Sequence, residues 1–363
     1  MDNKKLRVGV LGATGFVGQR LVTLLEGHPY FDVTVLGASS RSAGKVYEDV
    51  VGDRWKLTTP MPEYVKKMII RDLHNIDEIK DDVDFVFCAV NMDKKEIQEI
   101  EEKYAKAEIP VVSNNSAHRM TKDVPVIIPE INDAHLEVIK SQRKRLGTKK
   151  GFIATKPNCS IQSYVPPITA LLEFEPTEIL VTTMQAISGA GKTFKEWPEM
   201  QDNVIPYIGG EEQKSEVEPL KVWGHVEGDE IKLVEGIKIS AQCMRVAVTD
   251  GHMATVAINF KKKPTKEQIL KAWKEFSGKP QELGLPHAPK QFITYFEEDN
   301  RPQTHIDRDV EGGMGVTVGR LREDNIFQYK FVGLSHNTLR GAAGGAVLMA
   351  ELLYREGYLS GDK

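Results

Sequence analysis

A glycine-rich turn near the amino end constrains the fold of this chain more than any other feature. The apolar run 6–11 is followed at once by Gly12-Ala-Thr-Gly15-Phe-Val-Gly18, and a helical pattern begins inside that turn. Glycines at such a position permit the tight bend, let backbone N–H groups approach a pyrophosphate, and let the helix pack against the strand. The turn therefore predicts a nucleotide-binding unit, and glycines chosen only for packing are the alternative.

Short β-rich runs alternate with helical patterns through the first third of the chain. The pattern predicts strands at 6–11, 33–36, 84–90 and 111–113, and helices at 15–26 and 94–106. This alternation is typical of a parallel sheet of the Rossmann type, and it places the protein in the α/β class.

The periodicity changes after about residue 155. We expect helices near 159–174, around 211–222 and at 265–276, a strand at 179–185, and β-rich stretches over 232–260 and 314–334. These stretches predict a second, α+β domain with a largely antiparallel sheet. The small-residue segment 337–354 has a helical pattern.

The end of the second predicted strand indicates which dinucleotide the turn would accept. Proteins that bind NAD usually place Asp or Glu there, against the ribose 2′-hydroxyl. Here the sequence offers Ser39, Ser40 and Arg41, with no acid to repel a 2′-phosphate and with groups that can hold one. The segment favours NADP over NAD; a polar loop with one surface arginine is the alternative.

Composition excludes several classes of protein. A length of 363 residues suits two domains, and 48 basic against 52 acidic residues give a formal charge of −4, which does not favour nucleic acid. Neither the three cysteines nor the nine histidines show metal-ligand spacing, and the apolar runs are too short for a bilayer. We therefore expect a cytoplasmic protein without a metal site, a nucleic-acid partner or a membrane span.

Cys159 differs from Cys88 and Cys243 in its local sequence. It lies in PNCS (157–160), after an apolar strand and in the first turn of an expected helix, whereas the other two lie in β-rich runs. Unpaired N–H groups and the helix dipole at such a position stabilise a thiolate. This context leaves a nucleophile and an inert core cysteine equally open.

Two further motifs carry groups suited to acyl chemistry. In RVAVTDGH (245–252), Arg245 and His252 would lie near one another at the end of a strand. A guanidinium can hold a carboxylate through two hydrogen bonds, and a neutral imidazole can take up a proton. In QAISGAG (185–191), glycines let the backbone approach a ligand and the Gln185 amide can orient a carbonyl. Each motif alone could be a surface loop, but with a nicotinamide-binding fold and Cys159 they predict a thioester that is then reduced.

In these motifs taken together, the chain resembles the aspartate-β-semialdehyde dehydrogenases, particularly their archaeal and fungal branch. The likeness covers nearly the whole chain. It rests on GATGFVG (12–18), SNNSAHR (113–119), PNCS (157–160), QAISGAG (185–191), RVAVTDGH (245–252) and HNTLRGAAGGAV (336–347). Several motifs in the right order are far more specific than any one of them.

The resemblance implies roles for single residues. Cys159 would be the nucleophile that forms the acyl thioester, and His252 the acid/base residue. Gln185 and Asn158 would position the reacting acyl group, and Arg245 would hold the α-carboxylate of the substrate.

The same resemblance implies a phosphate site and an amino-group site. Arg119 and Lys221 would bind the phosphate, and Glu218 would bind the substrate amino group. The pair Glu211/Lys214 has the same spacing as Glu218/Lys221, and a solvated charged helix would also explain the whole stretch.

The resemblance further implies where the cofactor and the domain boundaries lie. Cofactor contacts are implied for Thr14, Gly15, Val17, Ser39, Arg41, Ser188, Gly189 and Asn337, to which the glycine turn and the polar loop add Gly12, Phe16, Gly18 and Ser40. The NADP-binding domain would be discontinuous, comprising 1–155 with 337–363, and the catalytic and oligomerisation domain would comprise 156–336.

The implied reaction is the NADP-dependent reductive dephosphorylation of L-4-aspartyl phosphate to L-aspartate 4-semialdehyde, in lysine, methionine and threonine biosynthesis. A related reductase acting on malonyl-CoA or N-acetylglutamyl phosphate and a non-catalytic NADP-binding protein are the alternatives. The resemblance also implies a homodimer or a homotetramer.

Overall fold

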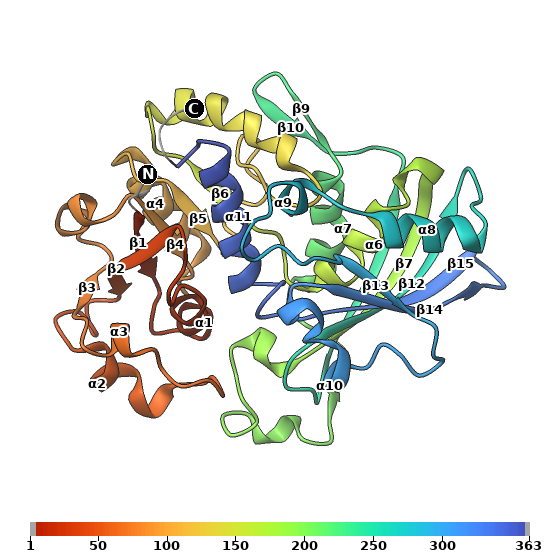
Figure 1. Ribbon diagram of the computed structural model, residues 1–363, viewed down its shortest axis with the longest axis horizontal. Coiled ribbons are helices and arrows are strands. Elements are labelled where there is room, and N and C mark those ends of the chain that lie inside the picture. Colours follow the sequence, from red (N-terminus) through yellow and green to blue (C-terminus); the bar gives the residue numbers. More distant parts are fainter. Residues whose placement is uncertain (1–4, 360–363) are drawn as a thin grey trace.

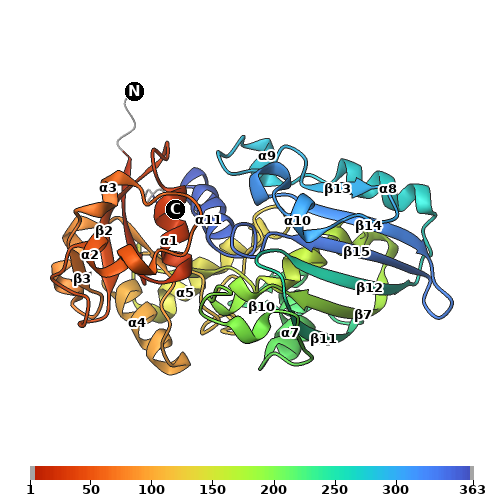
Figure 2. The ribbon, with the colours of Figure 1, turned by 90° about the horizontal axis from the view of Figure 1, so that it is seen from below.

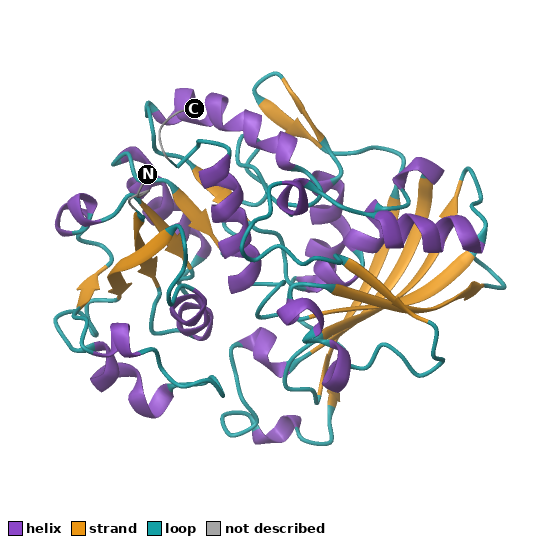
Figure 3. Ribbon diagram, in the orientation of Figure 1, coloured by secondary structure: helices purple, strands orange, loops and turns teal. Residues whose placement is uncertain are grey.

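Two β-sheets occupy opposite ends of the structure, a computed structural model that describes residues 5–359 (Figure 1). Figure 2, turned by 90°, shows the same arrangement, with helix α11 (Ala343–Arg355) between the two sheets. Figure 3 shows that helices lie around both sheets and in the region that separates them. Among the described residues, no helix combines the length and the apolar character that a membrane span requires.

The sheet near the amino end has six strands, all parallel, in the order β3-β2-β1-β4-β5-β6. Its strands are β1 Leu6–Leu11, β2 Phe31–Ala38, β3 Ile70–Asp72, β4 Phe85–Cys88, β5 Val111–Ser113 and β6 Ile153–Thr155. The strand order reverses at β1, between β2 and β4, and ligands of open α/β sheets bind at the carboxyl ends of the strands beside such a switch point. The predicted parallel sheet of the Rossmann type is confirmed.

Helices of the same part follow from local sequence signals. They are α1 Phe16–Leu24, α2 Tyr47–Val51, α3 Glu63–Lys66, α4 Lys94–Lys106 and α5 Ile139–Leu146. At the start of α4, the Asp93 side chain accepts the N–H of Lys95, and the Glu96 side chain accepts the N–H of Asp93. This reciprocal capping satisfies backbone donors that no helical carbonyl can reach, which fixes where α4 begins.

The second sheet has seven strands in the order β13-β14-β15-β12-β7-β11-β8. They are β7 Pro176–Gln185, β8 Val204–Ile205, β11 Lys238–Val246, β12 His252–Phe260, β13 Ile293–Phe296, β14 Val316–Glu323 and β15 Tyr329–Ser335, with β9 His225–Glu227 and β10 Glu230–Lys232 forming a separate hairpin. Most neighbours are antiparallel, as predicted, but β11 runs parallel to β7 and β13 runs parallel to β14.

One face of this sheet packs on helices, and the other face is less covered. The helices of this part are α6 Val165–Thr169, α7 Glu211–Val222, α8 Lys266–Glu275, α9 Lys279–Glu282 and α10 Thr304–Asp307. Along β7, Ile179 and Val181 are buried in the apolar core that includes α6 and α8 residues, whereas Leu180 between them is 45% exposed. The alternation follows from successive strand residues pointing to opposite faces.

Helix α11 packs into the core of the amino-terminal part. Its Ala346, Val347 and Leu353 belong to one buried cluster with Val8 and Val10 of β1. The carboxyl end of the chain therefore returns to the sheet formed by its beginning.

The structure corrects two of the predicted helices. The segment 159–174 forms separate short pieces, 3₁₀ turns at Ser160–Ser163 and Leu172–Phe174 on either side of α6, because two prolines within α6 cannot donate helical hydrogen bonds. The helix expected over 337–354 begins only at Ala343. The preceding turns are held by Asn337, whose amide donates to the Ser188 hydroxyl at 2.8 Å and accepts the Gly251 N–H at 2.7 Å.

Candidate active site

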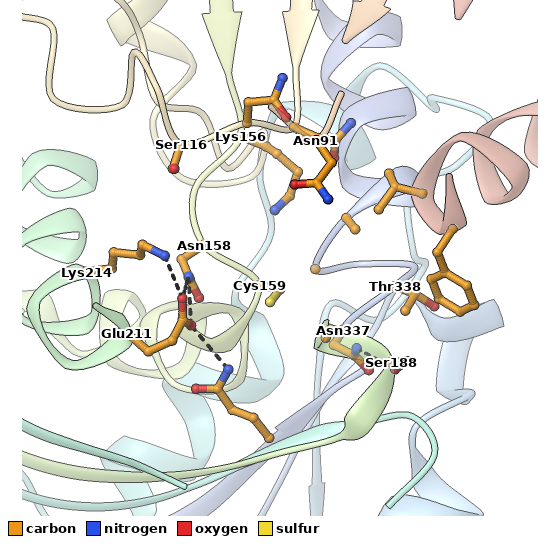
Figure 4. Close-up of a pocket in the computed structure, with 18 of the residues that line it drawn as sticks. Asn91, Ser116, Lys156, Asn158, Cys159, Ser188, Glu211, Lys214, Asn337 and Thr338 are labelled. Atoms are coloured by element: carbon orange, nitrogen blue, oxygen red, sulfur yellow. Dashed lines mark hydrogen bonds and ion pairs between the residues drawn. The ribbon is translucent and has the colours of Figure 1, made fainter. Parts of the chain in front are cut away.

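A cavity of about 440 Å³ opens at the carboxyl ends of the parallel strands (Figure 4). Loops that follow β1, β4, β5 and β6 line it from one side, and the ends of β7 and β11 with the start of α7 line it from the other. The predicted site residues that line this cavity are Phe16, Val17, Arg119, Asn158, Cys159, Gln185, Ser188, Gly189, Arg245 and Asn337. Six segments far apart in the sequence therefore meet at one place.

The glycine-rich turn has the form that a dinucleotide requires. Gly12 adopts a φ of +83°, and a Cβ atom there would lie 2.4 Å from the carbonyl oxygen of Ala89. A Cβ atom at Gly18 would lie 2.2 Å from the Gly12 carbonyl oxygen. Backbone without side chains therefore borders the cavity next to Phe16 and Val17, which lets its N–H groups approach a pyrophosphate.

The remaining predicted cofactor residues lie on the same edge of the sheet. Thr14 and Gly15 continue the turn after β1, and Ser39, Ser40 and Arg41 follow the neighbouring strand β2, outside the cavity. The last two are exposed. These positions fit a cofactor that carries a 2′-phosphate, because two hydroxyls and a guanidinium follow β2.

Cys159 has surroundings unlike those of the other cysteines. Cys88 and Cys243 lie in strands β4 and β11, as predicted, and both are fully buried, whereas Cys159 is partly exposed and lines the cavity. It precedes the four-residue 3₁₀ turn Ser160–Ser163 and not an α-helix. Such a turn has little macrodipole, so the predicted stabilisation of a thiolate by a helix dipole is wrong.

Charged side chains around the cavity offset part of the cost of a buried thiolate. Burial raises the pKa of Cys159 above its ordinary value, and the Glu211 carboxylate raises it further. Lys156, Arg119 and Arg245 act in the opposite direction, because each positive charge favours the thiolate. An anionic substrate that occupies the cavity would change this balance by pairing with the cations.

Arg245 and His252 lie near one another beside Gly189. A Cβ atom at Gly189 would lie 2.9 Å from both Arg245 Nη1 and His252 Nε2. Arg245 Nη1 donates to the Ala186 carbonyl at 2.7 Å, and the N–H of Ala186 donates to His252 Nδ1 at 3.0 Å. One peptide segment after β7 therefore orients both side chains.

The hydrogen bond at Nδ1 determines the protonation of His252. Because Nδ1 accepts, the proton of the neutral ring is on Nε2. Burial and the charge of Arg245 lower the pKa of His252 to about 3, so the ring is neutral at physiological pH. Its buried Nε2 has no hydrogen-bond partner among residues 5–359 and can donate to an oxygen of a ligand.

Replacing Gly189 with alanine is expected to lower kcat/KM by about 100-fold, because the new methyl group displaces both Arg245 and His252 by a fraction of an ångström or more. The matched control is Gly52→Ala, where a Cβ atom meets no atom within 4 Å and φ is −42°. Steady-state kinetics and thermal melting of both variants check the prediction. Wild-type kinetics in a folded Gly189→Ala protein would contradict it.

Glu211 organises the wall of the cavity formed by α7. The Asn158 amide donates to both carboxylate oxygens at 3.0 and 2.9 Å, the Gln185 amide donates at 3.2 Å, and the Lys214 ammonium donates at 2.8 Å (Figure 4). Burial would raise the pKa of Glu211, but Lys214 and the two amides hold it below its ordinary value. Of the two pairs that the spacing left open, Glu211/Lys214 is the one that lines the cavity.

Glu218 lies behind the cavity wall, where it holds two cavity-lining residues by hydrogen bonds. It accepts a hydrogen bond from Arg119 Nη1 at 3.0 Å and another from the backbone N–H of Asn158 at 2.6 Å. Arg119 also donates from Nη2 to the Asn114 carbonyl at 3.1 Å. Glu218 itself does not line the cavity, and its two hydrogen bonds hold Arg119 and Asn158 in place.

Lys221 is not available to a phosphate in this structure. Its ammonium donates to the carbonyl oxygens of Arg119, Thr121 and Val124 at 2.8, 2.7 and 2.9 Å. An ammonium has three N–H groups, so none is left for a ligand. The phosphate role that the resemblance implied for Lys221 is at odds with these contacts.

Sequence reasoning missed Asn91 and Lys156, which line the cavity beside Arg119 and Asn158. Lys156 directly follows the last residue of β6, and Asn91 is the third residue after β4. A polar residue just beyond an apolar parallel strand is the signal that could have found both, since the carboxyl ends of parallel strands form the binding edge.

Comparisons with known proteins agree with this geometry. A family model described as Semialdehyde dehydrogenase, NAD binding domain, matches residues 7–139, and one described as Semialdehyde dehydrogenase, dimerisation domain, matches residues 167–340. An aspartate-semialdehyde dehydrogenase from Aspergillus fumigatus is 44% identical, with 98% of this chain and 99% of the relative aligned. One from Methanothermobacter thermautotrophicus is 43% identical, with 96% and 99% aligned.

A solved structure is similar to this chain in three dimensions as well. The crystal structure of aspartate semialdehyde dehydrogenase with NADP from Candida albicans matches with a TM-score of 0.86 and 37% identity, over 98% of this chain and all of that chain. Fold, motifs and both halves of the sequence lead to one conclusion. The chain belongs to the aspartate-semialdehyde dehydrogenase family.

Proposed function

We propose that this chain is an NADP-dependent oxidoreductase that converts L-4-aspartyl phosphate into L-aspartate 4-semialdehyde and inorganic phosphate, a step of lysine, methionine and threonine biosynthesis. One observation carries the proposal. The cavity brings the Cys159 thiol together with four cationic side chains, next to the glycine-rich turn. Relatives that are 44% identical to this chain over nearly all of its length bear the name aspartate-semialdehyde dehydrogenase.

The cofactor site suits NADP. The turn from Gly12 to Gly18 would hold the pyrophosphate, Ser39 and Arg41 would hold the 2′-phosphate, and Ser188 with Asn337 would border the nicotinamide side of the cavity. When bound, the reduced cofactor supplies the reducing equivalents for the thioester.

Cys159 performs the covalent step. Its sulfur attacks the acyl carbon of the substrate, the C–S bond forms, the C–O bond to phosphate breaks, and the thiol proton ends on the departing phosphate. Arg245 binds the α-carboxylate, and the Glu211 carboxylate, kept ionised by Lys214, binds the α-ammonium. Asn158, whose amide is anchored on Glu211, fixes the acyl group in front of the sulfur.

His252 acts as a hydrogen-bond donor to the reacting acyl group. With Nδ1 occupied by the Ala186 N–H, only Nε2–H is free to face the substrate. Negative charge develops on the acyl oxygen when the thioester is reduced, and a preorganised donor in a buried site stabilises that charge strongly. When the C–S bond breaks and the aldehyde forms, the departing sulfur takes up a proton from water, and the Nε2 proton stays on the ring.

We also infer the organisation of the chain. Support for a homodimer comes from the match of residues 167–340 to a dimerisation-domain model, and from exposed Leu180 on the sheet and Tyr207 near it. The packing of α11 against β1 supports an NADP-binding domain formed by 1–155 with 337–363. A cytoplasmic location fits an enzyme whose Cys159 must stay reduced.

An assay in the oxidative direction tests the function. NADPH formation is followed from aspartate semialdehyde, inorganic phosphate and NADP⁺, with NAD⁺ and a panel of other acyl substrates in parallel. We expect turnover that depends on phosphate and that prefers NADP⁺ over NAD⁺. Absence of turnover with aspartate semialdehyde and phosphate, together with turnover of malonyl-CoA, would overturn the proposal.

A further inference from the structure

Lys156 is a buried cation without a carboxylate partner. It is 3% exposed, yet it lines the cavity, and Figure 4 shows its side chain reaching into the cavity near Cys159. Its ammonium donates to the carbonyl oxygen of Pro157, and no ion pair forms between Lys156 and any carboxylate of residues 5–359. Two of its N–H groups are therefore available, and a buried ammonium is costly unless an anion pairs with it.

Other buried polar atoms beside Lys156 also lack partners. Arg119 uses Nη1 and Nη2 for protein contacts, but its buried Nε has no hydrogen-bond partner among the described residues. Both amide atoms of Asn114, which lines the same cavity, are likewise buried and unpartnered. Buried polar groups in native proteins are nearly always hydrogen-bonded, so these atoms indicate a polar ligand.

Charge and chemistry identify the class of that ligand. Arg119 and Lys156 are both cationic, and both line the cavity on the side of the parallel sheet, whereas Arg245 lines it from the second sheet. Paired Lys and Arg side chains with free N–H groups are typical of phosphate binding. The resemblance implied phosphate binding for Lys221, but its ammonium donates all three N–H groups to carbonyl oxygens.

We propose that Lys156, together with Arg119, binds the phosphate group that leaves the substrate or attacks the thioester. This inference rests on the proposed function. In the oxidative direction, a phosphate oxygen attacks the thioester carbon on Cys159, the C–O bond forms, the C–S bond breaks, and the sulfur leaves as a thiolate. Lys156 neutralises the phosphate in both directions and stabilises the charge that the departing phosphate develops.

The charge of Lys156 depends on pH close to neutrality. Burial, and next the positive charge of Arg119, lower the pKa of Lys156 to about 7, with Arg340 acting in the same direction and Cys159 and Glu218 opposing it. Above this pH the free enzyme has a neutral Lys156, so phosphate binding must also take up a proton. Affinity for phosphate should then fall as the pH rises, although phosphate itself remains a dianion.

Three variants test the proposal in the assay with aspartate semialdehyde, phosphate and NADP⁺. Lys156→Met should raise the KM for phosphate by about tenfold or more, as expected for the loss of a charged hydrogen bond, and should change the KM for aspartate semialdehyde and NADP⁺ by less than about threefold. Lys156→Arg should restore much of the phosphate affinity. Lys140→Met, which removes an exposed lysine on α5, is the matched control and should behave as wild type.

A binding measurement without turnover gives an independent readout. Phosphate should raise the melting temperature of the wild-type protein and of Lys140→Met, and should raise that of Lys156→Met clearly less at the same concentration. In the wild type, the KM for phosphate should rise between about pH 8 and about pH 9.5, and in Lys156→Arg it should stay flat there, because arginine does not titrate. The pH profile of the wild type needs no substitution, so it still tests the proposal if a variant fails to fold.

The outcomes separate this inference from the proposed function. Absence of phosphate-dependent turnover in the wild type would overturn the function and with it the role of Lys156. Turnover in the wild type with an unchanged phosphate KM in folded Lys156→Met, or with a wild-type phosphate KM that is flat up to about pH 9.5, would overturn the role of Lys156 alone. Equal increases in the KM for phosphate in Lys156→Met and in Lys140→Met would also overturn it, since a general loss of positive charge would then explain the effect.

Discussion

Replacing Cys159 with alanine is expected to lower kcat by at least about 10⁴-fold and to leave NADPH binding and the melting temperature unchanged. Cys159 is the cysteine that lines the cavity, and alanine removes the sulfur on which the thioester forms while the surrounding side chains keep their contacts. No neighbouring hydroxyl or carboxylate of the cavity can replace a sulfur nucleophile that both forms and releases an acyl group at neutral pH. Single-turnover kinetics and cofactor fluorescence measure the two expectations.

Two control variants make that result specific. Cys243→Ala changes a fully buried residue of β11 and should cost stability but leave kcat within about threefold of wild type. Cys159→Ser keeps the size of the side chain and should be nearly as inactive as Cys159→Ala, because a hydroxyl in these surroundings is a far weaker nucleophile. Appreciable turnover in Cys159→Ala, or loss of NADPH binding in it, would instead assign Cys159 a structural role.

Strong local signals were enough to predict the first sheet and several element bounds. β1, β5, α4 and α7 begin and end where the sequence pattern placed them, because an apolar run, a capping residue or a change of periodicity marks each end. Strand β3 was missed, and β6 was indicated only as the apolar strand that precedes PNCS, since runs of three residues carry little periodicity of their own. The parallel pairing of β11 with β7 depends on contacts between residues about 60 positions apart, which no local pattern encodes.

The site was predictable as a set of motifs but not as a set of contacts. Motif order identified Cys159, Arg245 and His252; Arg245 lies near the end of β11, His252 begins β12, and Cys159 follows β6 by four residues. The choice between Lys221 and Lys156 needed the structure, because the same residue type either donates to carbonyl oxygens or remains open to a ligand, and only the fold distinguishes the two.

A buried ion pair beside the cavity carries the second large expected effect. Arg340 donates from Nη1 and Nη2 to the two oxygens of Glu130 at 2.9 and 2.7 Å, and from Nε to the Met314 carbonyl at 2.8 Å. The two side chains are 1% and 0% exposed. The pair joins the turns before α11, which contribute Thr338 to the cavity, to the segment between β5 and β6.

Arg340→Met is expected to lower the free energy of unfolding by about 3–5 kcal/mol, because it leaves the Glu130 carboxylate buried without a partner. Glu130→Leu should lower the free energy of unfolding by a similar amount, because it leaves the Arg340 guanidinium buried without its carboxylate partner. The double variant should be clearly less destabilised than the sum of the two, since an apolar pair of similar volume leaves no unpaired charge behind. Lys106→Met, which removes an exposed partner of Glu102 on α4, is the control and should cost less than about 1 kcal/mol. Urea unfolding of the wild type and the four variants measures these differences, and strictly additive losses in the double variant would show that Arg340 and Glu130 stabilise the fold independently of each other.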